Sequence, residues 1–160
     1  MTKLSSAFGE KYQAKRKDLL TRSFVLNGHT FKVRIPLVIE SDAIYKKVAN
    51  PDEETIEKIY QEITAPLRQF ENNQSEDFQF TDDDILVEGR SMREAAKNKA
   101  ITEARITEFF KLLVPEMEGV TLEDLTYADI EEEFPIAVQM LIVEKIGEVI
   151  SPTYREARGN

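Results

Sequence analysis

Few side chains of this sequence have the chemistry of a nucleophile, a general base or a soft metal ligand. The chain has no cysteine and a single histidine, His29. Without cysteine there can be no thiolate nucleophile, no thiolate metal site and no disulfide. His29 lies beside an Asn-Gly turn, where strand residues are half exposed, so a structural role is favoured over a catalytic one. A zinc site would need mostly carboxylate ligands, which is uncommon.

Acidic side chains are abundant, and their spacing limits what they can do. The run Asp82, Asp83 and Asp84 offers oxygen ligands to a cation such as calcium. It lacks the alternate-residue spacing, the central glycine and the closing glutamate of a calcium loop, so a solvated acidic loop or a helix cap is favoured. A carboxylate pair for glycosidic chemistry meets in space and not in sequence. An enzyme with unrecognised carboxylate chemistry is therefore kept as one alternative.

Glycine-rich phosphate loops do not occur in the sequence. The six glycines are isolated, and none forms GxGxxG, GxxxxGK[ST] or GxSxG. Gly89, Arg90 and Ser91 precede an expected helix and offer backbone donors to an anion, although capping of that helix is favoured. We therefore expect a non-enzymatic protein with no cofactor and no metal.

The remaining candidate site is apolar and lies at the end of an expected helix. It consists of Phe109, Phe110, Leu113 and Met117. Methionine and aromatic side chains are enriched where proteins meet, so these four are our candidate partner-binding residues. Ordinary core is the more common role of such a cluster, and both interpretations stay open at this point.

Length and composition indicate one globular domain, which we place over residues 21–152. The chain has 160 residues, of which 41% are hydrophobic and 32% are charged, a balance typical of globular proteins. Its first residues lack the apolar run of a signal peptide, and no stretch reaches the roughly 18 apolar residues of a membrane span. We expect a cytoplasmic protein with no membrane partner.

Charge is divided between the two parts of the chain. Residues 1–36 carry eight Lys and Arg against two Asp and Glu, or +6, and the remaining thirteen against twenty-eight give −15. The acidic part repels phosphate backbones, and the basic part has little aromatic interleaving, so no nucleic-acid partner is expected. We describe residues 1–20 as a polar basic arm and residues 153–160 as a polar tail. Such a division favours salt-dependent contacts with a partner or between copies, so a homo-oligomer is possible.

A β-hairpin is predicted over residues 22–37. Asn27 and Gly28 stand between two β-prone runs, and both tolerate the positive φ of a type I′ turn. Phe31, Val33 and Ile35 alternate with two basic residues, which predicts one buried and one exposed face.

Five helices are expected, over residues 41–49, 51–70, 91–113, 121–134 and 135–150. Asn50 is the expected cap of the second helix, with Pro51 at its first position, and Pro66 must end or kink it near Ala65. Residues 71–84 are expected to be a mobile loop with a short extended piece around Phe78 to Phe80.

The last predicted helix is apolar nearly all round, as a helix buried against several neighbours would be. We therefore expect residues 136–150 to be the core of the domain and its most buried segment. The fold class is therefore α+β and mainly α-helical, with an N-terminal β-hairpin packed on a bundle of four to five helices.

This order of elements resembles the small tail assembly chaperones of long-tailed phages, or siphoviruses. The resemblance rests on the polar start, the hairpin with its aliphatic-Asn-Gly turn between Phe24 and Ile35, and the acidic helices that end in a polar tail. It implies a phage or prophage protein without enzymatic activity. Its partners in the bacterial host cytoplasm would be the long helical tape measure protein and the tail tube protein. A small regulatory or structural protein-interaction module is the other alternative.

Overall fold

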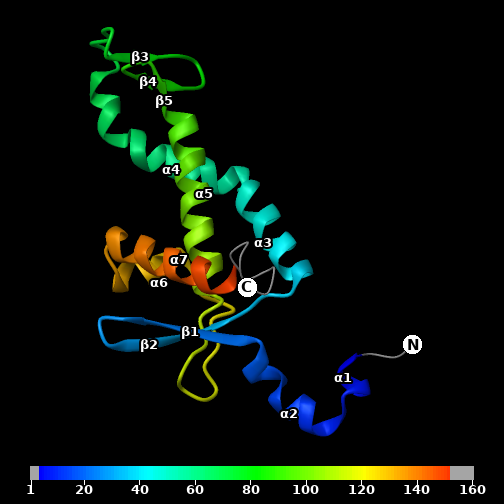
Figure 1. Cartoon of the computed structure of the whole chain (residues 1–160). Coiled ribbons are helices and arrows are strands. Elements are labelled where there is room, and N and C mark those ends of the chain that lie inside the picture. The colour runs from blue at the N-terminus through cyan, green and yellow to red at the C-terminus, as the bar shows by residue number, and fades with distance from the viewer. Residues whose placement is uncertain (1–3, 152–160) are drawn as a thin grey trace. The chain divides into compact units, whose positions relative to one another are not determined.

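A computed structural model describes residues 4–151 of the chain (Figure 1). The described part divides into two compact units. Unit 1 is made of the chain up to Asp42 together with the chain from Ile106 onward, and unit 2 is Ala43–Arg105. One globular domain over residues 21–152 was expected, and no linker or shift in composition marks this division in the sequence.

The observed elements confirm a mainly helical α+β fold. In chain order they are α1 (Leu4–Ala7), α2 (Gly9–Leu19), β1 (Thr21–Leu26), β2 (His29–Arg34), α3 (Val38–Ala49), α4 (Glu53–Thr64), the 3-10 helix η1 (Ala65–Phe70), β3 (Phe78–Phe80), β4 (Ile85–Val87), β5 (Arg90–Ser91), α5 (Met92–Phe110), α6 (Tyr127–Glu133) and α7 (Ile136–Ile150).

The hairpin of unit 1 forms as its sequence predicts. Asn27 and Gly28 have φ values of 50° and 83°, which a type I′ turn requires at both central positions. β1 and β2 pair antiparallel in the register that sets Phe24 opposite Phe31, and the two rings stack with centroids 5.2 Å apart. Val33 is completely buried, while its neighbours Lys32 and Arg34 are exposed.

A short stretch of the C-terminal half extends this hairpin. The Arg34 N–H donates to Leu112 O at 2.8 Å and the Val114 N–H donates to Lys32 O at 2.8 Å. These bonds satisfy the outer edge of β2, which would otherwise expose unpaired backbone groups. The hairpin also contacts α7. The core of unit 1 therefore joins residues from both ends of the chain.

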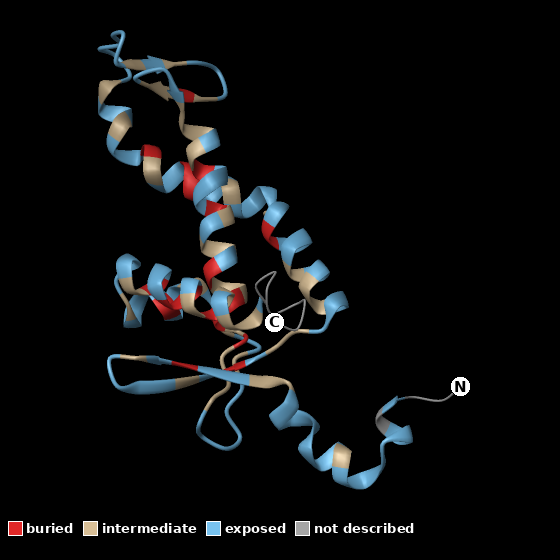
Figure 2. Cartoon of the chain, in the orientation of Figure 1, coloured by how far each residue is buried: buried red, intermediate tan, exposed pale blue. Residues whose placement is uncertain are grey.

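The expectation that residues 136–150 form the most buried segment is wrong. Ile142, Val143 and Ile146 of α7 are buried, but Ile136, Met140 and Leu141 are 55%, 42% and 38% exposed (Figure 2). The exposed positions share one side of the helix, because residues four apart lie above one another. α7 therefore packs with one face only and presents an apolar face to solvent.

α6 begins with the capping arrangement that its sequence predicts. The Asp129 N–H donates to the Thr126 hydroxyl, and the Thr126 N–H donates to the Asp129 carboxylate. The buried Gln139 side chain then joins α6 to α7, since it accepts a hydrogen bond from the Tyr127 hydroxyl at 2.8 Å and donates to Phe134 O at 2.7 Å. Both polar ends of this buried amide are satisfied.

In unit 2, α4 begins two residues later than expected. The Asp52 carboxylate, not Asn50, accepts from a backbone N–H of the first turn. Asn50 donates instead to Lys46 O at 2.8 Å, so it closes the end of α3. The predicted effect of Pro66 is confirmed, because α4 ends at Thr64 and the chain continues as the tighter helix η1.

α4 packs on the first half of α5. The hydrophobic cluster between them consists of Ile59, Tyr60, Ala96 and Ala100, with Ile56, Ile63 and Met92 packed against it. A small antiparallel sheet in the order β3, β4, β5 precedes α5. Residues 71–84 were expected to be mobile except around Phe78 to Phe80, and it is there that β3 lies; β4 and β5 were not anticipated.

Candidate protein-binding surface

His29, for which a structural role was favoured, lies on the hairpin. Its side chain is 57% exposed, with Nε2 3.8 Å from Glu116 Oε1. The edge of its ring faces Phe31, with centroids 4.6 Å apart. The structure thus gives His29 a packing contact and an exposed charge partner.

The aspartate run and the Gly89 to Ser91 segment meet at the start of α5. Asp84 accepts from the N–H groups of Ile85 at 2.8 Å and Arg93 at 3.1 Å, and from the Ser91 hydroxyl at 2.5 Å. The Ser91 oxygen accepts from the Glu94 N–H at 3.1 Å. These side chains cap α5, as the favoured interpretation held. In the part of the chain that the structure describes, no group of three acidic or histidine side chains is arranged to hold a metal ion.

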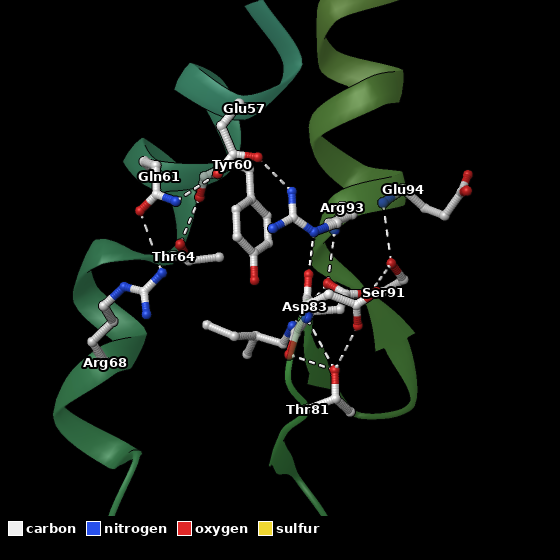
Figure 3. A network of polar contacts seen from close by, with 12 residues as sticks. Glu57, Tyr60, Gln61, Thr64, Arg68, Thr81, Asp83, Ser91, Arg93 and Glu94 are labelled. Atoms are coloured by element: carbon white, nitrogen blue, oxygen red, sulfur yellow. Dashed lines mark hydrogen bonds and ion pairs between the residues drawn. The ribbon is translucent and has the colours of Figure 1, made fainter. Parts of the chain in front are cut away.

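Arg93 is at the centre of a polar network in unit 2 (Figure 3). Its guanidinium donates to Glu57 Oε2 at 2.6 Å and lies 3.9 Å from the centre of the Tyr60 ring. Its Nε also donates to the carbonyl oxygen of Asp83. One side chain of α5 therefore contacts both α4 and the turn before β4.

The pKa shifts in this network point to a structural role. The hydrogen bonds from Arg93 and Gln61 lower the pKa of Glu57, and the bond to Glu57 raises the pKa of Arg93. Burial raises the pKa of Tyr60. Each shift moves the group away from neutral pH, which suits an ion pair that joins elements and does not suit proton transfer.

The predicted partner-binding cluster does not form one exposed surface. Phe109 and Phe110 are 5% and 4% exposed, and the Phe110 ring lies 6.0 Å from that of Phe134. Leu113 is half-buried beside the hairpin, and only Met117 is exposed, at 74%. The two phenylalanines therefore belong to the core of unit 1, the alternative that the sequence left open.

Three consecutive apolar side chains are exposed at the start of α3. Leu37, Val38 and Ile39 are 46%, 79% and 76% exposed. We call residues 37–39 the α3 patch. This patch was not predicted, because the helix was expected to begin at residue 41 and residues 37–39 were expected to be a connection. The informative signal was an apolar run directly before Glu40.

Glu40 fixes the backbone of the α3 patch. Its carboxylate accepts from Arg34 Nη1 at 2.8 Å and from the Leu37 N–H at 3.3 Å. Burial raises the pKa of Glu40, but the two hydrogen bonds and the charge of Arg34 outweigh it, so the pKa lies below its usual value. The ionised carboxylate thus ties the first turn of α3 to β2 at neutral pH.

The α3 patch is suited to binding another protein. Isolated apolar side chains on a surface are ordinary, whereas contiguous ones mark interaction sites. A patch on a fixed helical turn loses little conformational freedom when a partner covers it.

Comparison with protein-family models, with curated proteins and with solved structures found no match. Within residues 4–151, none of the helices has the length and apolar character needed to cross a membrane.

Proposed function

We propose that this chain is a non-enzymatic protein that binds a helical protein partner through the α3 patch. The observation that carries the proposal is the exposure of Leu37, Val38 and Ile39 on a turn held by Glu40. Burying a Val or Ile side chain contributes about 1.5 to 3 kcal/mol. Covering two or three such side chains contributes to affinity as part of a larger contact, because association must also offset the lost translational and rotational freedom.

The partner we propose is the tape measure protein of a long-tailed phage. The resemblance of the hairpin and the acidic helices to tail assembly chaperones suggests this class of partner. A long helical protein has amphipathic segments whose apolar faces must be shielded from water before assembly, and an apolar patch can bind those faces. In this role the chain acts in the cytoplasm of the bacterial host, keeps the tape measure protein soluble and helps tail tube subunits assemble around it.

Co-expression tests this proposal directly. The chain is expressed with the tape measure protein of the same genome, and the soluble fraction of that partner and its co-purification are measured. We expect the double variant V38S/I39S to bind about tenfold or more weakly, because it removes two apolar contacts. The matched control is Val25→Ser, which changes a residue 61% exposed on β1 outside the patch.

Two outcomes would contradict the proposal. If V38S/I39S and Val25→Ser bind alike, the α3 patch is not the binding surface. If the wild-type chain neither solubilises nor retains the tape measure protein, the partner class is wrong, and a regulatory interaction module becomes the better interpretation.

A further inference from the structure

The exposed face of α7 combines apolar and acidic residues. Ile136, Met140, Glu144 and Glu148 follow one another at intervals of four and are all exposed, and Leu141 lies beside them. Residues at this spacing form one stripe along a helix. We call these five residues the α7 face. No lysine or arginine occurs in the sequence between Lys111 and Lys145. Lys145 Nζ lies 3.7 Å from Glu148 Oε2, so Glu144, Glu148 and Lys145 together leave this side of α7 with a net negative charge.

α2 carries a face of complementary character. Lys11, Tyr12, Lys15 and Leu19 fall on one side of the helix, and the ring of Phe8, the residue before α2, contacts that of Tyr12. We call these five residues the α2 face. Phe8 and Leu19 are 58% and 65% exposed, and the Phe8 and Tyr12 rings meet edge to face at 5.0 Å.

α2 contributes no buried residue to the core of unit 1. An isolated helix of 11 residues is marginal in water, because most helical stability comes from packing. Lys11 and Lys15 also repel each other at i and i+4. α2 therefore gains stability from any surface that covers its apolar residues and neutralises its lysines.

We infer that the α2 face docks on the α7 face of a second copy of this chain. Apolar residues meet apolar residues in this contact, and Lys11 and Lys15 meet Glu144 and Glu148. The contact is reciprocal, since each copy offers one α2 and one α7, and it closes as a symmetric dimer. It uses neither the α3 patch nor a phage partner, so it does not depend on the proposed function.

The junction after α2 favours a second copy over the same chain. Only Leu20 separates α2 from β1, and hydrogen bonds hold it on both sides: its N–H donates to Arg16 O at 3.1 Å, and its carbonyl accepts from the Ile35 N–H at 2.7 Å. The Thr21 hydroxyl also donates to Lys17 O at 2.6 Å. These bonds fix the direction in which α2 leaves the hairpin.

Charge exchange between two variants tests the inference. K11E/K15E gives an acidic α2, and E144K/E148K gives a basic α7. We expect the full-length wild type to form dimers at low salt and to dissociate as ionic strength rises, because exposed charges are screened. Each double variant alone should self-associate at least roughly tenfold more weakly. Light scattering and sedimentation equilibrium report the mass, and circular dichroism checks folding.

The mixture of the two variants gives the decisive result. The acidic α2 of one variant faces the basic α7 of the other, and their remaining faces are both wild type, so the equimolar mixture should dimerise again. Docking within one chain would give no rescue on mixing and would overturn the inference. A wild-type protein that is monomeric at low salt and high concentration would overturn it as well.

Two methionine variants measure the apolar contribution to dimerisation separately from that of the charges. Met140→Gln removes an apolar side chain from the α7 face and should weaken dimerisation about tenfold. Met117→Gln is the matched control, because Met117 is 74% exposed in a loop outside both faces. Equal affinities of these two variants would show that α7 does not form the contact.

Discussion

At the scale of single residues, α7 shows how one apolar helix is divided between core and surface. Ile146 has no exposed surface, whereas Leu141 is 38% exposed. Truncation of a buried aliphatic residue loses its transfer free energy and leaves a cavity, but truncation at the surface leaves no cavity.

We therefore expect Ile146→Ala to lower the free energy of unfolding by about 2 to 5 kcal/mol. Leu141→Ala should lower it by less than half as much. Urea denaturation followed by circular dichroism measures both. Equal losses in the two variants would mean that the exposed face of α7 is packed against another part of the protein.

The ion pair of Glu57 and Arg93 predicts a dependence of stability on pH. The pKa of Glu57 is lowered from its ordinary 4.5 by its hydrogen bonds to Arg93 and Gln61. A lowered pKa in the folded state contributes stability that is present above the ordinary pKa and is lost as the pH falls through the folded value. Glu57→Gln should therefore be less stable than the wild type at neutral pH, and the difference should shrink in acid.

Unfolding curves at pH 7 and at about pH 3 would measure this difference. Glu62→Gln is the control, since Glu62 is an exposed glutamate of the same helix. A difference between Glu57→Gln and wild type that stays constant with pH would show that the charge of Glu57 does not stabilise the fold.

At the scale of elements, the start of α6 depends on a reciprocal cap. Thr126→Ala removes the hydroxyl that accepts from the Asp129 N–H, and the loss of such a cap costs about 0.5 to 2 kcal/mol. Thr121→Ala, a threonine followed by an acid at the same spacing but outside the helix, should change stability by less than about 0.5 kcal/mol. Thermal unfolding of the two variants compares them, and a larger loss at Thr121 would refute this assignment of the cap.

Elements defined by neighbouring residues could be predicted from the sequence. The turn at Asn27 and Gly28, the end of α4 before Pro66 and the cap at Thr126 each follow from the conformational limits of one or two residues. These limits act locally, whatever the rest of the chain does.

Features made by distant residues could not be predicted. β4 is stabilised by pairing with β3 and β5, and Glu57 meets Arg93 across 36 positions of sequence. The burial of the predicted partner-binding residues could not be predicted for the same reason. Phe109 and Phe110 have the side chains of a binding surface, but the packing of unit 1 buries them, while the first turn of α3 extends backward to expose Leu37 to Ile39.

At the scale of the whole molecule, the clustered acids do not imply a cation site. Asp84 already accepts three hydrogen bonds from groups of its own chain. We therefore expect isothermal titration of the full chain with ATP, magnesium, calcium or zinc to show no stoichiometric binding. A micromolar site for any of them would contradict the non-enzymatic proposal and revive carboxylate chemistry.

Unit 1 is made of two separate stretches of the chain, and this affects the order in which the two units fold during synthesis. Unit 2 is one continuous stretch, so it can close as soon as Arg105 has emerged. The hairpin is translated much earlier, but the parts of the chain that contact it, Leu113 opposite Val33 and the helix α7, come after all of unit 2. Domains generally fold as units during synthesis. A nascent chain that pauses near residue 105 therefore carries a folded unit 2 and a hairpin without the later elements that contact it. The uncovered hairpin is then the surface at greatest risk of aggregation.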